Sequence, residues 1–67
     1  MIRCHLAREM GARKLKVVDI VRETGLSRHT LTAMYKEEVL KVDLEALDKL
    51  CEFFECEVSD LLEYVKD

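Results

Sequence analysis

The sequence predicts an all-α domain of five short helices, and three observations lead to this expectation. Proline is absent and glycine occurs only twice in 67 residues, so residues that interrupt helices are rare. No stretch alternates steadily between apolar and polar residues, as a half-buried strand does. Apolar residues instead recur three and four positions apart, as on one face of a helix. We therefore expect one compact helical domain over residues 1–67.

The first two expected helices cover residues 2–12 and 17–24. In the first helix an apolar residue returns at every fourth position: Ile2, Leu6 and Met10. The second helix contains a run of apolar residues and ends at Gly25, because glycine adopts a left-handed backbone conformation after a helix at little cost.

Three further helices are indicated by capping residues. Ser27 is a good N-cap for a helix over residues 28–36, and Asp43 for a fourth helix. Ser59 is expected to cap a short fifth helix that runs through Leu61, Leu62 and Val65. The fourth helix supplies most of the apolar surface, in a stripe of Leu44, Leu47, Leu50, Cys51 and Phe54.

Length and composition exclude several classes of protein. The chain is too short for an interdomain cleft, and no small-molecule substrate is evident. His5 and His29 lie far apart, and no phosphate-binding loop or metal-ligand spacing is present, so we expect no enzyme, metal or cofactor. No apolar run could span a bilayer or serve as a signal peptide, which predicts a cytoplasmic protein with no membrane partner. The three cysteines form no CxxC pair and are expected to be reduced core residues.

Charge is distributed unevenly along the chain. Residues 1–36 contain eight Lys and Arg against three Asp and Glu, which gives +5. Residues 37–67 contain three cations against eleven acids, which gives −8 and restores the net charge of −3. A polyanion would therefore be attracted to the first half and repelled by the second.

Residues 17–36 have the pattern of a helix, a tight turn and a second helix, as in DNA-binding proteins. Gly25 supplies the turn and Leu26 fills the corner between the helices. The two helices are expected to pack against the rest of the domain through the buried side chains of Ile20, Leu31 and Met34.

The outward face of the second helix of this motif follows from helical geometry. At about 100° per residue, Leu31 and Met34 lie on one side. The opposite side carries a strip near the N-terminal end, formed by Arg28, His29, Thr32 and Ala33. Arginine donates two hydrogen bonds to guanine, threonine bonds to several base edges, and alanine contacts the thymine methyl group. This strip is therefore expected to read bases in the major groove.

These residues resemble the Cro/CI-type (lambda-repressor-like, XRE) helix-turn-helix regulators of transcription. The resemblance rests on Thr24-Gly25-Leu26-Ser27 with Leu31 four residues later, on Asp43-Leu44, and on the closing segment 58–64. It implies a repressor that binds specific sequences of double-stranded DNA with the helix over residues 28–36. Together with the flanking lysines, it predicts phosphate contacts from Lys14, Lys16, Ser27, Tyr35, Lys36 and Lys41.

Three positions depart from the family pattern. Val17 stands where a phosphate-binding glutamine is common, and Val21 where alanine is usual at the helix crossing. Lys14 replaces a common glycine, and we expect it to need a different backbone conformation.

The C-terminal region predicts a homodimer. The apolar surface of this region exceeds what one helical stripe can bury. We therefore expect dimer contacts from Phe53, Tyr64 and Val65. A two-fold dimer would place two copies of the reading helix about 34 Å apart on a palindrome. The alternative is a protein-interaction module on the same scaffold, in which DNA binding is weak or lost; Val17 and the acidic second half favour this alternative.

Overall fold

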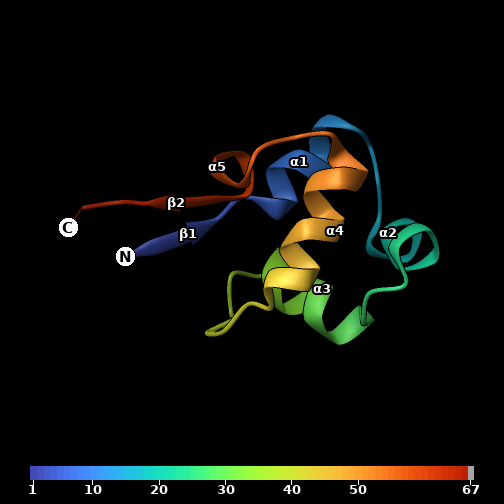
Figure 1. The fold of residues 1–67 in the computed structure, drawn as a ribbon, viewed down its shortest axis with the longest axis horizontal. Helices are drawn as coiled ribbons and strands as arrows, with labels where there is room; N and C mark the ends of the chain where they lie inside the picture. Colours follow the sequence, from blue (N-terminus) through green and yellow to red (C-terminus); the bar gives the residue numbers. More distant parts are fainter. Residues whose placement is uncertain (67) are drawn as a thin grey trace.

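The computed structural model describes residues 1–66, in which seven short elements follow one another. These are β1 (Ile2–Cys4), α1 (Leu6–Ala12), α2 (Val17–Thr24), α3 (Arg28–Tyr35), α4 (Leu44–Phe54), α5 (Val58–Leu61) and β2 (Leu62–Tyr64). The five helices pack into one body, and β1 and β2 form a ribbon that projects from it with both chain ends at its tip (Figure 1). No helix in the described part of the chain is long and apolar enough to cross a membrane.

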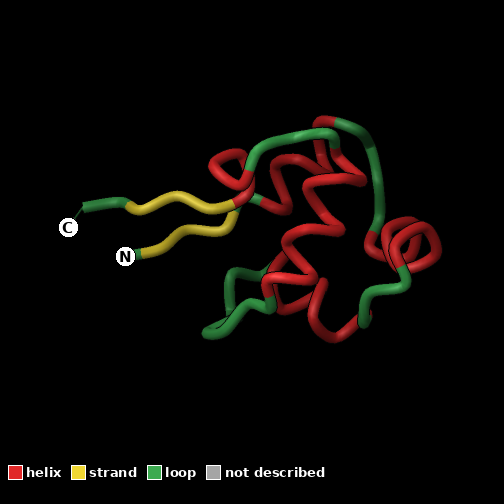
Figure 2. The backbone as a smooth tube through the Cα atoms, in the orientation of Figure 1, coloured by secondary structure: helices red, strands yellow, loops and turns green. Residues whose placement is uncertain are grey.

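The expected all-α architecture is incomplete, because residues 2–4 form a strand instead of the first turn of a helix. β1 and β2 pair antiparallel, with Ile2 opposite Tyr64 and Cys4 opposite Leu62 (Figure 2). Each strand is three residues long and supplies hydrogen-bonding partners to the other. A three-residue strand repeats its two-residue period too few times to be recognised, and its partner lies at the other end of the chain.

The core draws on all five helices. The fully buried side chains are Leu6 of α1, Ile20 of α2, Leu31 and Met34 of α3, Leu50 of α4 and Leu61 of α5. Two residues expected on apolar stripes lie outside this core: Ile2 is 63% exposed on β1 and Leu44 is 81% exposed at the start of α4. A terminal residue of an element can extend past its neighbours, so the periodic pattern overestimates its burial.

The helix caps agree with expectation at two of three positions. Ser27 Oγ accepts a hydrogen bond from Thr30 N at 3.3 Å, and Asp43 caps α4 by accepting one from Glu45 N. The expected cap at Ser59 is wrong, because α5 begins at Val58 and Glu57 N donates to Asp60 Oδ2 at 2.9 Å. α5 ends at Leu61, so Leu62 and Val65 lie outside it.

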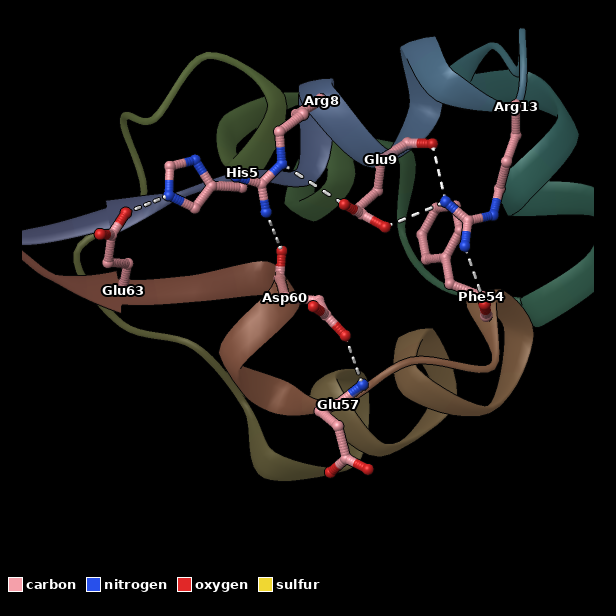
Figure 3. Close-up of polar contacts among 8 residues, drawn as sticks. All are labelled: His5, Arg8, Glu9, Arg13, Phe54, Glu57, Asp60 and Glu63. Carbon is pink, nitrogen blue, oxygen red and sulfur yellow. Dashed lines mark hydrogen bonds and ion pairs between the residues drawn. The ribbon is translucent and has the colours of Figure 1, made fainter.

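Arginines of α1 and its C-cap tie this helix to the C-terminal half of the chain (Figure 3). Arg13 Nη2 donates to Phe54 O at 3.0 Å, and its guanidinium lies 4.9 Å from the centre of the Phe54 ring. Arg8 Nη2 donates to Asp60 O at 2.9 Å. His5 Nε2 lies 2.6 Å from Glu63 Oε1 on β2. Part of the cationic charge of residues 1–36 is thus used inside the fold.

Candidate nucleic-acid interface

The segment over residues 17–36 forms a helix-turn-helix. In Figure 1, α2 is viewed nearly end-on and α3 lies across the view, so the two helices cross steeply. Gly25 closes α2 with φ of +75°, in the left-handed region, and its N–H donates to Val21 O at 2.9 Å. Thr24 Oγ1 donates to Ile20 O and accepts from Leu26 N. The turn therefore has its polar groups satisfied by local bonds.

The inner side of α3 anchors the motif. Leu31 and Met34 are fully buried, as is Ile20 of α2, while Val21 and Leu26 are half-buried against the same core. These residues hold α3 by one side only. The other side is left at the surface.

That surface contains the four predicted base-reading residues. Arg28 and His29 are exposed, while Thr32 and Ala33 are half-buried. Arg28 is the first residue of α3, directly after the Ser27 cap, and the first turn contains no acidic residue. A cation here opposes the helix dipole, so its position is not explained by helix stability.

The ion pairs separate two groups of cations. In the described residues, the partners of Asp and Glu are Arg3, His5, Arg8, Arg13, Arg22 and Lys49. Arg28 forms no ion pair with a residue from 1 to 66. The same holds for the four lysines predicted to contact phosphate, which are Lys14, Lys16, Lys36 and Lys41. Because no carboxylate of residues 1–66 compensates them, these cations can interact with an external anion.

The predicted phosphate contacts come from several segments. Lys14 and Lys16 lie in the connection between α1 and α2, Lys36 follows α3, and Lys41 lies in the loop before α4. Tyr35, the last residue of α3, is 48% exposed, and Ser27 is exposed beside Arg28. The α1–α2 connection starts on the side of the body away from α3 and descends to α2 (Figure 1). The residues predicted to contact phosphate therefore come from separate segments before, within and after the motif.

The three departures from the family pattern are accommodated by the fold. Val17 and Val21 are half-buried and pack against the core. The expectation that Lys14 needs a different conformation from glycine is wrong, because Lys14 has φ of +56° in the left-handed region. This conformation lets Leu15 N return to Met10 O at 2.9 Å and closes α1. Asp19 accepts from Lys16 N at 2.9 Å, which caps α2 without a side-chain cap at Lys16.

Glu37, just after α3, has a structural role that no local sequence pattern indicates. It also has a left-handed backbone, with φ of +57°. Its carboxylate bonds to the Arg3 guanidinium and to Cys4 N, so it links α3 to β1. These bonds, first that from Arg3, lower the pKa of Glu37 to about 2. The partners lie far apart in the chain, so no local spacing identifies them.

The three predicted dimer residues do not form one group. Phe53 is half-buried on α4, with its ring edge-on to Phe54 at 5.1 Å between centroids. Tyr64 is 71% exposed on β2, and Val65, directly after β2, is also exposed. The exposed apolar surface at the C-terminal end is therefore centred on the ribbon.

Comparisons with known proteins agree with this geometry. Residues 5–67 match the model of a family described as the Cro/C1-type HTH DNA-binding domain. The chain is similar to an uncharacterized HTH-type transcriptional regulator of Bacillus subtilis (strain 168), YozG, with 26% identity over 58 residues, which cover 87% of this chain and 69% of that protein. No solved structure matches the chain significantly.

Proposed function

Because the chain belongs to the Cro/C1-type helix-turn-helix DNA-binding family, we propose that it is a transcriptional repressor that reads the major groove of duplex DNA with α3. The observation that carries this proposal is a surface strip on α3, in which Arg28 and His29 are exposed and Thr32 and Ala33 are half-buried, on a helix whose other side is buried. A helix held in this way can enter a groove without disturbing the core.

Arg28 has the main role in base reading. It lies at the N-terminal end of α3, where recognition helices contact base edges, and it has no ion-pair partner among residues 1–66. Its guanidinium can donate two parallel hydrogen bonds to O6 and N7 of guanine. His29 and Thr32 supply further donors and acceptors, and Ala33 is small enough to meet a thymine methyl group.

The unpaired lysines position the helix on the duplex. Lys14, Lys16, Lys36 and Lys41 neutralise phosphates, with Ser27 and Tyr35 as hydrogen-bonding partners. Each phosphate neutralised contributes about −0.9 to the slope of log affinity against log salt. Affinity for DNA is therefore expected to fall steeply between low and physiological salt.

We also propose that the protein acts as a homodimer on a palindromic operator. Two copies of α3 would then meet successive major grooves about 34 Å apart on one face of the duplex. Repression follows from occupancy of the operator, which excludes other proteins from the same site. The exposed Tyr64 and Val65 favour a dimer built on the C-terminal region.

The decisive experiment selects bound fragments from random duplex DNA with wild-type protein and with Arg28→Ala. The wild type is expected to enrich a palindrome, and Arg28→Ala to lose preference at one base of each half-site, with an affinity about 5- to 150-fold weaker, which corresponds to about 1–3 kcal/mol. Arg22→Ala is the matched control, since Arg22 is equally basic and exposed but is paired with Asp19. An unchanged preference in Arg28→Ala would remove Arg28 from the readout.

Protein interaction is the second candidate function, favoured by Leu40, which is 99% exposed in the loop after α3. A salt series separates the two functions. DNA binding weakens steeply with added salt, whereas an apolar contact with a protein does not. Absence of binding to any duplex in dilute buffer would favour the second candidate.

A further inference from the structure

The outer edge of β2 is an open strand edge. The sheet contains two strands, so β2 has one neighbour, β1, and one free side. In Figure 1 the ribbon projects from the helical body: α5 lies beside the start of β2 on the side away from β1, and the rest of the strand extends beyond the helices. Isolated two-stranded ribbons are only marginally stable in water, and proteins usually cover or blunt such edges.

The backbone groups on this free side can be identified from the pairing. Val65 N donates to Met1 O at 2.8 Å, and His5 N donates to Leu61 O at 2.7 Å. Hydrogen-bonded pairs alternate along an antiparallel ladder, so Tyr64 directs its N–H and C=O away from β1. Leu62 C=O points the same way, while Leu62 N–H is already bonded to Val58 O.

The two edges of the ribbon differ. On the outer edge of β1, Cys4 N donates to the Glu37 carboxylate at 3.1 Å. Ile2 N–H and C=O also point away from β2, but Ile2 and Cys4 line a pocket together with Glu37 and residues 39–42, so the loop after α3 lies beside this edge. In the described residues, no side chain bonds to the outward groups of Tyr64. The open edge is therefore that of β2.

We propose that this edge is a dimerisation surface that pairs with β2 of a second copy, antiparallel and centred on Tyr64. The two copies would then form one four-stranded sheet in the order β1, β2, β2 of the second copy, β1 of the second copy. This inference supplies the interface for the homodimer of the proposed function. It depends on that function only for the use of the dimer on DNA.

A second copy suits this edge because the strand is complementary to itself. In a two-fold antiparallel pair, opposite residues lie on the same face of the sheet, so the register is centred on a residue. Centring on Tyr64 forms two reciprocal hydrogen bonds between the Tyr64 residues. It also lets Lys66 N–H reach Leu62 C=O of the other copy.

Charge favours this register over one centred on Glu63. Centring on Glu63 would place two carboxylates directly opposite each other, which is destabilising. Centring on Tyr64 places Glu63 opposite Val65 of the other copy and Lys66 opposite Leu62, so no like charges face each other. The Glu63 carboxylate in addition forms a hydrogen bond with His5 Nε2 of its own copy, at 2.6 Å.

Side chains support the same register. Ile2 lies opposite Tyr64 on one face of the ribbon, and both are largely exposed, at 63% and 71%. In the dimer, Ile2 and Tyr64 of one copy and the same two residues of the other copy form one continuous row across the sheet. Aromatic and β-branched cross-strand pairs of this kind stabilise sheets.

The first test is sedimentation of the whole chain without DNA. We expect a reversible dimer, and at least about a tenfold rise in its dissociation constant for Tyr64→Pro, which lacks the outward N–H. Tyr64→Thr controls for loss of the ring, and Ile2→Pro for a proline on the outer edge of β1; both are expected to dimerise more strongly than Tyr64→Pro. Circular dichroism establishes that the variants are folded.

The second test is disulfide cross-linking with diamide in a Cys51→Ser, Cys56→Ser background. Tyr64→Cys is expected to form a covalent dimer, because directly opposite residues lie within the Cα separation that a disulfide spans. Residues 63 and 65 are each displaced by two residues along the strand from the same residue of the other copy, so Glu63→Cys and Val65→Cys are expected to form no covalent dimer. Cross-linking at either of these positions but not at residue 64 would overturn the register, and a wild-type chain that stays monomeric at millimolar concentration would overturn the interface.

A third arm keeps the two proposals apart. Tyr64→Pro is expected to retain binding to a single DNA half-site while losing its preference for the full palindrome. If Arg28→Ala loses half-site binding but dimerises as strongly as the wild type, the result supports base reading by α3 and shows that dimerisation does not depend on it. If the wild type dimerises but binds no DNA, only the proposed function is contradicted. If Tyr64→Pro dimerises as strongly as the wild type, only the β2 interface is contradicted.

Discussion

Glu37 holds Arg3 with both oxygens of its carboxylate: Oε1 accepts from Nε at 2.8 Å and Oε2 from Nη2 at 2.9 Å. Oε1 also accepts from Cys4 N at 3.1 Å. Because Glu37 follows α3 directly after its C-cap and Arg3 lies on β1, this contact joins the C-terminal end of α3 to the ribbon. The helix proposed to enter DNA and the strand beside the proposed dimer interface are thus linked by one carboxylate.

Loss of this carboxylate should lower stability in a pH-dependent way. The hydrogen bonds from Arg3 and Cys4 lower the pKa of Glu37 to about 2, below its ordinary value of 4.5. A carboxyl group whose pKa is lower in the folded state contributes stability that is fully present above the unfolded pKa and is lost as pH falls toward the folded pKa. Glu37→Gln is therefore expected to lower the urea midpoint at pH 7, with a difference that shrinks between about pH 4.5 and 2.

The measurement is a set of urea titrations at several pH values and two salt concentrations. Both side chains are partly exposed, so added salt should also reduce the difference. Glu38→Gln is the control, since the adjacent Glu38 is exposed and forms no ion pair with any residue from 1 to 66. A difference that stays constant from pH 7 to pH 2 would show that the charge of Glu37 does not contribute.

The two glycines should respond to alanine with opposite signs. Gly25 has φ of +75°, which alanine adopts only with strain, so Gly25→Ala is expected to cost about 1 kcal/mol. Gly11 lies inside α1 with a helical backbone, so Gly11→Ala is expected to gain about 0.5 kcal/mol. An added Cβ meets nothing within 4 Å at either site, so a packing effect does not intervene. Thermal unfolding measures both, and equal signs would contradict the assignment.

The helices were predictable from the sequence because their signals are local. The second helix and its Gly25 end, and the Ser27 and Asp43 caps, depend on residues within a few positions of each other. The strands were not predictable, because a three-residue strand at each end is stabilised by a partner across the whole chain. The spacing of Ile2, Leu6 and Met10 imitated a longer helix by coincidence.

The exposure of the candidate site could be derived in part. Burial of Leu31 and Met34 at helical spacing requires Arg28 and His29 to face outward, as they do. Which cations stay unpaired could not be derived, because Arg3 and Arg8 find their partners through the tertiary fold. The uneven charge along the chain therefore overstated the positive charge that is available to a polyanion.

Leu31 should be important for the position of α3. It is fully buried among core side chains, so Leu31→Ala removes apolar contacts and leaves a cavity, at an expected cost of about 2–5 kcal/mol. Leu40→Ala is the matched control, because Leu40 is 99% exposed and should change stability by less than about 0.5 kcal/mol. Urea unfolding compares the two, and similar costs would contradict the described core.

Lys14 allows stability and DNA affinity to be changed separately. Its φ of +56° is strained for lysine, so Lys14→Gly is expected to stabilise the fold by up to about 1 kcal/mol. The same change removes a proposed phosphate contact, so the slope of log affinity against log salt should become shallower by about 0.9. Lys14→Asn removes the charge but keeps a residue that tolerates the left-handed conformation, so it should reproduce the shallower slope. If both variants keep the wild-type slope while Lys36→Gln does not, the charge of Lys14 lies outside the DNA contact, and the interface is confined to the side of the body that contains α3.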